Sequence, residues 1–238
     1  MDAEAARRLR PSPLDTDWLV MRGLREAVRQ VMRTDVARPG ATALDLGCGS
    51  SPYRPLFTET GLRYIGADLS DGGADLVIDA SGRVPLADGS VDVVLSFQVL
   101  EHVRDLDAYL GEARRLVRDD GWMILSTHGN WLYHPHPEDH RRWTREGLVA
   151  DVASRGFEVV ACVPVIGPLA WTTVLRLTCY AFVLRKIPLV GRGIAAALSV
   201  LFNLKAWVED RVTPEWVRAD NACVYVTLSR PVAPRRPA

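Results

Sequence analysis

Seven short apolar runs constrain the fold of this chain more than any other feature of its sequence. The segments between several of them carry apolar residues at every third or fourth position, as on one face of a helix. The runs read ATALDL, YIGAD, DLVID, VDVVLSF, WMILST, EVVACV and CVYVTLS. Strands that alternate with helices predict an α/β fold with a doubly wound, mostly parallel sheet of seven strands.

Helical periodicity is clearest in three segments. LREAVRQVM places five apolar side chains on one face, and Asp17 stands before it as the expected N-cap. A second helix is expected between VDVVLSF and WMILST, with Gly121 closing it. A third follows Thr144, which we expect to cap it, while Trp143 packs against the core.

Composition excludes some classes of protein. The chain has 29 basic and 29 acidic residues, whereas a protein that coats nucleic acid usually carries a basic excess. We therefore expect no nucleic-acid partner.

The N-terminal residues MDAEAARRLRPSP lack the apolar stretch of a secretory signal, and the tail RPVAPRRPA is expected to be disordered. No CxxC pair occurs, so a cytoplasmic protein with free thiols is expected at Cys48, Cys162, Cys179 and Cys223.

Acidic and glycine residues gather where the first strands end. Gly47 and Gly49 follow the first strand and allow a tight turn close to a ligand, with Asp45 directly before them. Asp68 ends the second strand, where a carboxylate accepts hydrogen bonds from ribose hydroxyls, and Asp79 ends the third. Ligands of doubly wound sheets bind beyond these strand ends. The spacing is GxG and not GxGxxG, which argues against an NAD enzyme, although that alternative stays open.

The motifs together resemble the class I S-adenosylmethionine-dependent methyltransferases, particularly the small bacterial enzymes of the methyltransferase-11-like kind. The resemblance runs from about Ala41 to Val163 and implies a Rossmann-like core. It rests on LDLGCGSSPYRPLF, YIGADLS, VIDASGRVPLADGSVDVVLSFQVLEHV, EARRLVRDDGWMILST and RRWTREGLVADVASRGFEVV. The resemblance departs at Ser51, where many relatives have a third glycine; serine is small, so little effect is expected.

The resemblance implies a binding site for S-adenosyl-L-methionine. Residues around Asp45, Gly47 and Gly49, Cys48 included, would hold its methionine part. Asp68 and Leu69 would hold the ribose. Asp79 and Ala80 would lie beside the adenine, and Phe97 and Gln98 would line the site after the fourth strand.

The stretch NWLYHPHPEDHRRWT holds His134, His136 and His140 and follows the fifth strand, at the same end of the sheet. A hydroxyl acceptor needs a base, and we name His140 and Asp139 as the first candidates and His134 as the next. The H-x-H-x3-H spacing could gather a metal, but two prolines stiffen the loop and we predict none. Quinone O-methyltransferases have a similar EHV segment thought to bind a metal, but Gln98 stands here near the place of a further carboxylate. Glu101 and His102 are equally compatible with structural roles.

Residues 164–221 are mostly apolar and too long for a simple connection. They predict two helices, from about Leu169 to Arg185 and onward to about Arg211, separated by Pro188, Gly191 and Gly193. Between Pro164 and Val208 there are five basic residues and no acidic one, with Trp171, Tyr180 and Trp207 interleaved. This composition suits an anionic membrane surface. A substrate lid or a homodimer contact remains an alternative, since Arg176 and Arg185 fall on opposite helix faces.

Four regions are therefore expected: an N-terminal helical segment at 1–40, a cofactor-binding core at 41–163, the helical insertion at 164–221, and the last strand with its tail at 222–238. The predicted activity is methyl transfer to an oxygen, nitrogen or carbon of an apolar or lipid-linked small molecule. The location expected is cytoplasmic, peripheral at the inner face of the membrane. A soluble natural-product or sugar methyltransferase and a non-catalytic S-adenosylmethionine-binding protein are the alternatives.

Overall fold

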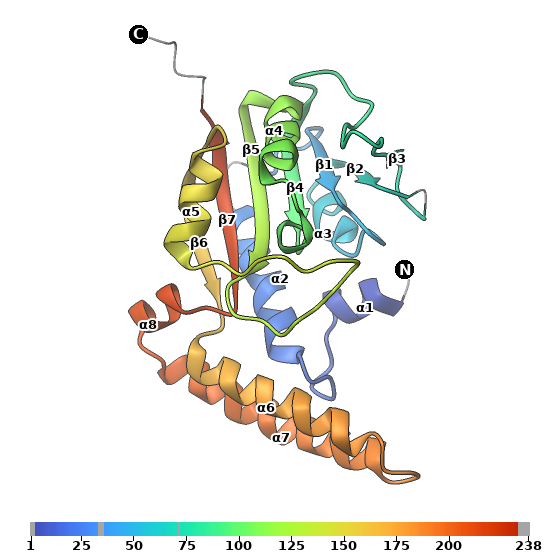
Figure 1. Ribbon diagram of the computed structural model, residues 1–238, viewed down its shortest axis with the longest axis vertical. Helices are drawn as coiled ribbons and strands as arrows, with labels where there is room; N and C mark the ends of the chain where they lie inside the picture. The colour runs from blue at the N-terminus through green and yellow to red at the C-terminus, as the bar shows by residue number, and fades with distance from the viewer. Residues whose placement is uncertain (1–2, 33–35, 71, 233–238) are drawn as a thin grey trace.

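The computed structural model describes residues 3–32, 36–70 and 72–232. Helices and strands alternate along most of the chain, as the sequence predicts (Figure 1). In chain order the elements are α1 (Ala3–Leu9), α2 (Trp18–Met32), β1 (Thr42–Leu46), α3 (Arg54–Thr58), β2 (Arg63–Asp68), β3 (Leu76–Val77), β4 (Val91–Phe97), a 3-10 turn η1 (Leu100–His102), α4 (Leu106–Leu116), β5 (Val117–His128), α5 (Arg145–Ala153), β6 (Phe157–Val165), α6 (Pro168–Leu184), α7 (Gly191–Val212), α8 (Glu215–Asp220) and β7 (Val224–Pro231).

The strands of the described residues form one seven-stranded sheet in the order β3-β2-β1-β4-β5-β7-β6. The first five strands pair in parallel, and β7 runs antiparallel between β5 and β6. This confirms the predicted doubly wound, mostly parallel α/β fold. The chain reverses its direction of winding between β1 and β4, so a crevice is expected beyond the carboxyl ends of these two strands.

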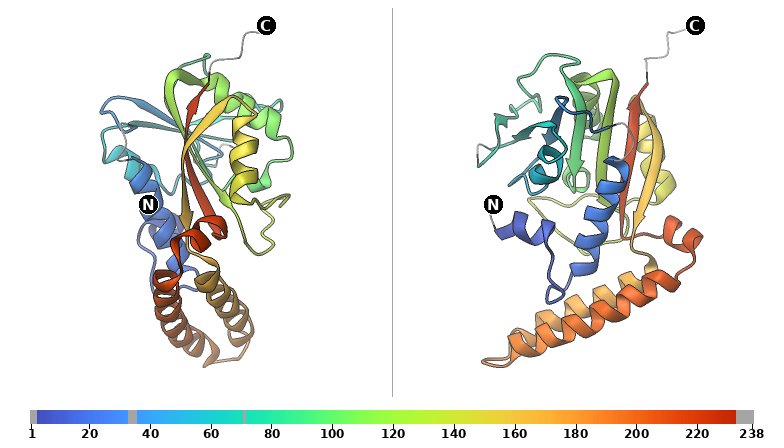
Figure 2. Two further views of the ribbon diagram at one scale, coloured as in Figure 1. Left: turned by 90° about the vertical axis from the view of Figure 1, so that its left-hand side faces the viewer. Right: turned by 180° about the vertical axis from the view of Figure 1, so that it is seen from behind.

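Helices cover both faces of the sheet (Figure 2). The apolar residues of α2 and α3 form one core with β1, β4 and β7. Those of α4 and α5 form a second core on the opposite face. The predicted face of α2 is confirmed, because Leu24, Ala27, Val28, Val31 and Met32 are all buried. The side chain of Asp17 pairs with Arg7 and makes no capping contact with α2.

Helices α6 and α7 form an antiparallel hairpin that lies beyond the carboxyl ends of β4 and β5 (Figures 1 and 2). The hairpin is inserted between two neighbouring strands, since Val165 at the end of β6 pairs with Val224 at the start of β7. Within the described ranges, no helix combines the length and apolar character needed to cross a bilayer.

Several predicted boundaries are wrong. Helix α4 ends at Leu116, not at Gly121, because Val117 already pairs with Val91 and begins β5. Gly191 and Gly193 lie inside α7 and do not separate the two helices. The short helix α8 was not predicted. Of the tail expected to be disordered, Arg230 and Pro231 belong to β7, while 233–238 lie outside the described residues.

Candidate functional site

The glycine turn after β1 comes close to its neighbours on one side and is open on the other. Gly47 and Gly49 have φ values of +78° and +52°, which favour glycine. A Cβ on Gly47 would lie 2.8 Å from a methyl group of Val99, whereas a Cβ on Gly49 would meet nothing within 4 Å. The amides of Gly47 and Cys48 donate to the carbonyl of Ala67 at 2.8 and 3.0 Å, which ties the turn to β2. The backbone at Gly49 is therefore fixed in position and has free space beside it for a ligand.

Asp68 stands at the end of β2 and faces this turn. Its carboxylate accepts hydrogen bonds from the amides of Gly49 and Leu69, both at 2.7 Å. Each carboxylate oxygen is thereby oriented and keeps a lone pair for a further donor. The Leu69 side chain is exposed beside it. This arrangement can accept hydrogen bonds from two hydroxyls of a ribose.

Asp45 is buried beneath the turn. The Tyr64 hydroxyl donates to its Oδ2, while Oδ1 has no hydrogen-bond partner among the described residues. Burial raises the pKa of Asp45 to about 7, although the Tyr64 hydrogen bond opposes the rise. A buried carboxylate oxygen without a donor is costly, so the site suits a ligand that brings a cation or an N–H group. The sulfonium and ammonium groups of S-adenosylmethionine fit this requirement.

Three further predicted residues have mainly structural contacts. Cys48 is buried, and its burial raises the pKa of the thiol to about 11, so it packs as a neutral side chain. Asp79 shapes a turn: its Oδ1 accepts from the Ser81 amide, the Ser81 hydroxyl and the Arg83 amide at 2.8, 2.6 and 3.0 Å. Ala80 is exposed beside it. The adenine contact of this turn stays a prediction.

Phe97 and Gln98 end β4. Phe97 is buried and meets the ring of Tyr53 edge-on, with centroids 4.9 Å apart, so it belongs to the core under α3. Gln98 has a φ of +57°, and its Nε2 donates to the Ser126 hydroxyl at 3.0 Å. A strained backbone held by specific contacts is common at functional sites.

A cavity of about 490 Å³ opens beyond the ends of β4 and β5, next to Gln98. It lies between the histidine loop and the N-terminal helices. Its walls combine apolar, aromatic and titratable side chains, from Arg7, Arg8, Asp17, Val20, Met21, Leu24, Gln98, His128, Trp131, His134 and His136. A cavity of this size beside a cofactor site suits a small molecule.

The structure separates the three base candidates of the histidine loop. His134 lines the cavity, and burial together with the neighbouring histidines lowers its pKa to about 4, so it is neutral near pH 7. Asp139 is an anchor: Arg142 binds both of its oxygens, one of which also accepts from the His134 amide at 2.8 Å. The Arg142 hydrogen bonds lower the pKa of Asp139 to about 2.

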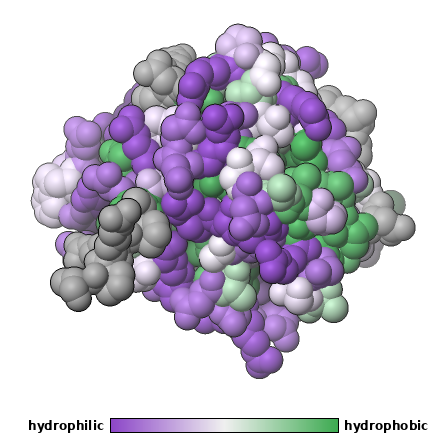
Figure 3. All heavy atoms as spheres, turned by 90° about the horizontal axis from the view of Figure 1, so that it is seen from above, coloured by the Kyte–Doolittle hydropathy of each residue, from purple (hydrophilic) through white to green (hydrophobic). Residues whose placement is uncertain are grey.

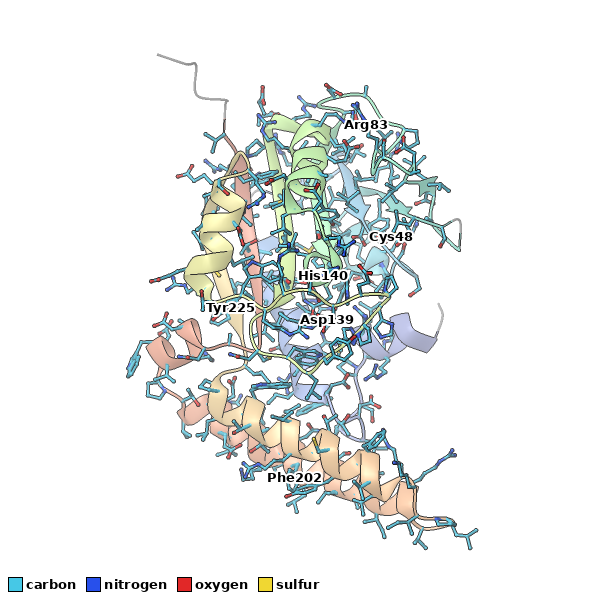
Figure 4. All side chains as sticks on the ribbon, in the orientation of Figure 1. Cys48, Arg83, Asp139, His140, Phe202 and Tyr225 are labelled. Atoms are coloured by element: carbon cyan, nitrogen blue, oxygen red, sulfur yellow. The ribbon has the colours of Figure 1, made fainter. Side chains whose placement is uncertain are left out.

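His140 lies on the same loop but is not part of the cavity wall (Figure 4). Its Nε2 is 2.9 Å from a carboxylate oxygen of Glu138, and its amide donates to the Glu101 carbonyl at 2.8 Å. Among the three candidates, these placements favour His134 as a group that contacts an acceptor. The predicted cap of α5 is confirmed, since the Thr144 hydroxyl accepts from Gly147 at 3.1 Å, and Trp143 is buried.

Sequence reasoning missed His128, the last residue of β5. Its ring lines the cavity and is buried, and its Nδ1 lies 3.0 Å from Oε1 of the buried Glu101. The signal was present, because His128 directly follows an apolar run that ends at the cofactor edge. The ring of His134 lies 4.5–5.7 Å, between centroids, from the rings of His102, His128 and His136. Nevertheless, no group of three or more His, Cys, Asp or Glu side chains in the described ranges is arranged to hold a metal.

Comparisons with known proteins agree with this geometry. The model of a family described as a methyltransferase domain matches residues 21–161. A protein of Mycolicibacterium smegmatis named probable S-adenosylmethionine-dependent methyltransferase is 30% identical over 136 residues, which cover 50% of this chain and 53% of that protein. The malonyl-[acyl-carrier protein] O-methyltransferase of Serratia marcescens is 28% identical over 113 residues, 43% of this chain and 44% of that one.

The fold is likewise shared with solved structures. The 1,6-didemethyltoxoflavin-N1-methyltransferase of Burkholderia thailandensis has a TM-score of 0.55 at 19% identity, covering 89% of this chain and 79% of that chain. The chain spans about half the length of the curated relatives it matches. The family match covers the glycine turn, the strand-end carboxylates and the histidine loop together. The chain therefore belongs to the methyltransferase domain family.

Proposed function

We propose that the protein transfers a methyl group from S-adenosylmethionine to an oxygen, nitrogen or carbon of an apolar or lipid-linked small molecule. One observation carries the apolar part of this proposal: an aromatic residue of the cavity wall stacks on an aromatic residue of the helical hairpin. Trp131 of the wall stacks on Trp171 of α6, with ring centroids 4.8 Å apart and planes 15° apart. An acceptor that arrives along the hairpin would meet aromatic surface up to the cavity.

The residues of the cofactor site have separable roles in this reaction. Asp68 and the turn at Gly47 and Gly49 bind the cofactor, and Asp45 offers a buried carboxylate near its charged end. The cofactor supplies an already activated methyl group. The protein's own task is to align the acceptor atom about 3 to 3.5 Å from the reacting carbon and to exclude water. The buried His128 and the partly buried His134 and Trp131 provide such a dry wall.

The hairpin has an unusually apolar surface for a solvent-facing element. Thirteen large hydrophobic side chains are exposed on it: Leu169, Tyr180, Phe182, Val183, Ile187, Leu189, Val190, Ile194, Val200, Leu201, Leu204, Val208 and Val212. Polar side chains cover most of the face at the opposite end of the molecule (Figure 3). Extended exposed apolar surface marks an interaction site more often than chance.

The charges of the hairpin favour an anionic lipid surface as the partner that covers its exposed apolar side chains. Between 164 and 208 there is no acidic residue, and the five basic residues are all exposed: Arg176, Arg185, Lys186, Arg192 and Lys205. Glu209 and Asp210 follow in α7, and Lys205 forms an ion pair with Glu209. The Lys186 ammonium lies 4.4 Å from the ring centre of Phe182, so a cation and an aromatic ring stand together near the turn of the hairpin. Each cation contributes about 1 kcal/mol at an anionic surface, and the apolar side chains add burial. We therefore place the hairpin on an anionic membrane.

The reaction is tested with methyl-labelled S-adenosylmethionine and two extracts of the host, one lipid and one water-soluble. Label in the lipid fraction is the expected result. Label confined to the soluble fraction would contradict the lipid-linked acceptor and leave the hairpin as a lid or dimer contact. Tight cofactor binding without transfer to any extract would contradict the enzymatic proposal and favour a cofactor-binding protein.

Membrane contact is tested by sedimentation with vesicles of phosphatidylglycerol and phosphatidylcholine. The variant Phe182→Glu/Leu189→Glu is expected to abolish sedimentation, because both side chains are more than half exposed and reach no core. The matched control, Val77→Glu/Val160→Glu, changes two exposed hydrophobic residues on the edge strands β3 and β6. If the intact protein does not sediment, or if both variants behave alike, the membrane proposal is wrong.

A further inference from the structure

Glu101 and His128 form a buried pair at the edge of the cavity. Glu101 has no exposed surface, and its Oε1 lies 3.0 Å from Nδ1 of His128, which is 3% exposed. The two atoms meet at ion-pair distance, and neither has another hydrogen-bond partner among the described residues. The other carboxylate oxygen accepts a hydrogen bond from the Thr127 hydroxyl at 2.8 Å. The residues of the cofactor site described above do not include this pair.

We propose that His128 is the general base of the reaction, oriented by Glu101, and that the acceptor atom is therefore the oxygen of a hydroxyl group. This inference rests on the proposed methyl transfer and narrows it to one class of nucleophile. Nitrogen nucleophiles that carry a lone pair, by contrast, attack without a base. Glu101 and His128 would then have no role in the reaction.

The charge of Glu101 fixes the tautomer of His128. Burial alone would raise the pKa of Glu101, but His128 and the Thr127 hydroxyl lower it below its usual value, so the group is a carboxylate. If Nδ1 carried no proton, its lone pair would face the Glu101 carboxylate at 3.0 Å between two buried side chains. Nδ1 therefore holds the ring proton, and Nε2 keeps its lone pair on the side of the ring away from Glu101.

Two rings of the histidine loop pack against the ring of His128. Its plane is parallel to Trp131, with centroids 4.9 Å apart and an angle of 1°, and Trp131 is in turn backed by Trp171. The ring of His134 meets His128 edge-on at 5.7 Å. Other charged or titratable groups of the cavity are His136 on the same loop and Arg7, Arg8 and Asp17 on the N-terminal segment. Among the described residues, no carboxylate lies within ion-pair distance of the His134 ring as Glu101 does of His128.

Methyl transfer to a hydroxyl acceptor moves one methyl group and one proton. The oxygen forms a bond to the methyl carbon while the carbon–sulfur bond breaks and its electron pair stays on sulfur. The hydroxyl proton moves to Nε2 of His128, and Glu101 stabilises the resulting imidazolium. The base returns to its starting state by releasing the proton to water when the products leave. Glu101 is a positioning residue, since it acts through His128.

The first test needs no acceptor. Nitrogen-15 NMR of the protein with S-adenosylhomocysteine at pH 7.5 reports which ring nitrogen of His128 is protonated. The cross-peak is assigned by its loss in His128→Asn or, if that variant does not fold, by elimination with variants at the other histidines. A proton on Nδ1 is expected. A proton on Nε2 with a bare Nδ1 would overturn the proposal. In Glu101→Gln, we expect the two tautomers to mix.

The second test uses the labelled product from the host extract. It should release its label as methyl iodide in hot hydriodic acid but not as methanol in mild alkali, because a methyl ether survives alkali and a methyl ester does not, and it should give no N-methyl or C-methyl compound. His128→Asn should lower kcat about 100-fold or more with unchanged calorimetric affinity for S-adenosylhomocysteine, and His134→Asn should lower it less. A labelled N-methyl or C-methyl product, or full kcat in His128→Asn, would refute the base. Failure to find any product would count against the proposed function instead, and the NMR result would still decide the state of the pair.

Discussion

Trp131 and Trp171 stack face to face although they belong to different parts of the chain, the histidine loop and helix α6. Trp131 also stacks on His128, so three parallel rings run from the hairpin to the cavity wall. Trp171 is largely buried, while Trp131 is only partly buried. A change at the hairpin therefore acts on the cavity through one aromatic column.

Trp171→Phe should loosen this column while leaving an aromatic ring in the core. We expect a loss of about 1 to 2 kcal/mol in the free energy of unfolding, because packing and stacking area are both reduced. Amide hydrogen exchange of residues 129–142 should become faster. Trp207→Phe on α7 is the control, since Trp207 contacts Arg211 and makes no stack with the loop. Unchanged exchange in Trp171→Phe would show that the loop is held by other contacts.

Cofactor binding should release a proton from Asp45. The pKa of this carboxyl is about 7 in the free protein because of its burial, and a cationic ligand beside it favours the ionised form. Below pH 7 the free protein holds the proton and the complex does not, so affinity should rise with pH up to about 7. Calorimetry in buffers of different ionisation enthalpy measures the release. Asp45→Asn should release none; equal release by wild type and variant would assign the proton elsewhere.

Asp68→Ala should weaken cofactor binding by about tenfold or more, since it removes a charged acceptor and unties the amides of Gly49 and Leu69. Asp68→Asn keeps one acceptor oxygen and should bind with intermediate affinity. Calorimetric titration with S-adenosylhomocysteine gives both values. An unchanged affinity in the alanine variant would rule out this carboxylate as a cofactor ligand.

Ser51→Gly should stabilise the protein by about 0.5 to 1 kcal/mol. Ser51 has a φ of +53°, a left-handed conformation that costs an L residue free energy and costs glycine little. The sequence suggested that serine is harmless here because it is small, yet the constraint lies in the backbone. Urea unfolding of the free protein measures the effect, and Ser51→Val should show the opposite sign. Destabilisation by glycine would mean that contacts of the hydroxyl outweigh the strain.

Asp139→Ala should release the histidine loop. In the folded protein Arg142 holds the pKa of Asp139 near 2, below its usual 3.8, so the ion pair stabilises the fold above pH 3.8. This contribution is lost as the pH falls toward 2. The variant should therefore unfold at lower urea concentration at pH 7, and the difference from wild type should vanish near pH 2. A constant difference at all pH values would point to lost packing, not to lost charge.

The parts of the site that the sequence predicts are those set by local pattern. The glycine turn, the carboxylate at the end of β2 and the hairpin helices each follow from a few neighbouring residues and their periodicity. The pairing of Glu101 with His128 does not, because it joins a 3-10 turn to a strand end. Likewise, the sequence makes Asp139 a candidate base, whereas in the fold Arg142 donates hydrogen bonds to both of its carboxylate oxygens.

The end of α4 shows why helix boundaries escape such reasoning. Residues 117–121 could extend a helix by local preference, with Gly121 as its stop. In the fold, Val117 pairs with Val91 across the sheet, and this tertiary contact draws the chain into β5 five residues before Trp122. The position of β7 between β5 and β6 is also a property of the whole sheet that no single segment encodes.

Because β6 and β7 are adjacent and Val165 faces Val224, the chain leaves the sheet at Val165 and returns to the same point. The hairpin is thus an insertion in the connection between two neighbouring strands, whereas Asp45, Asp68 and Phe97 stand on β1, β2 and β4, nearer the other edge of the sheet. A longer, shorter or different insertion at this point would leave every strand register and the ends of β1, β2 and β4 unchanged.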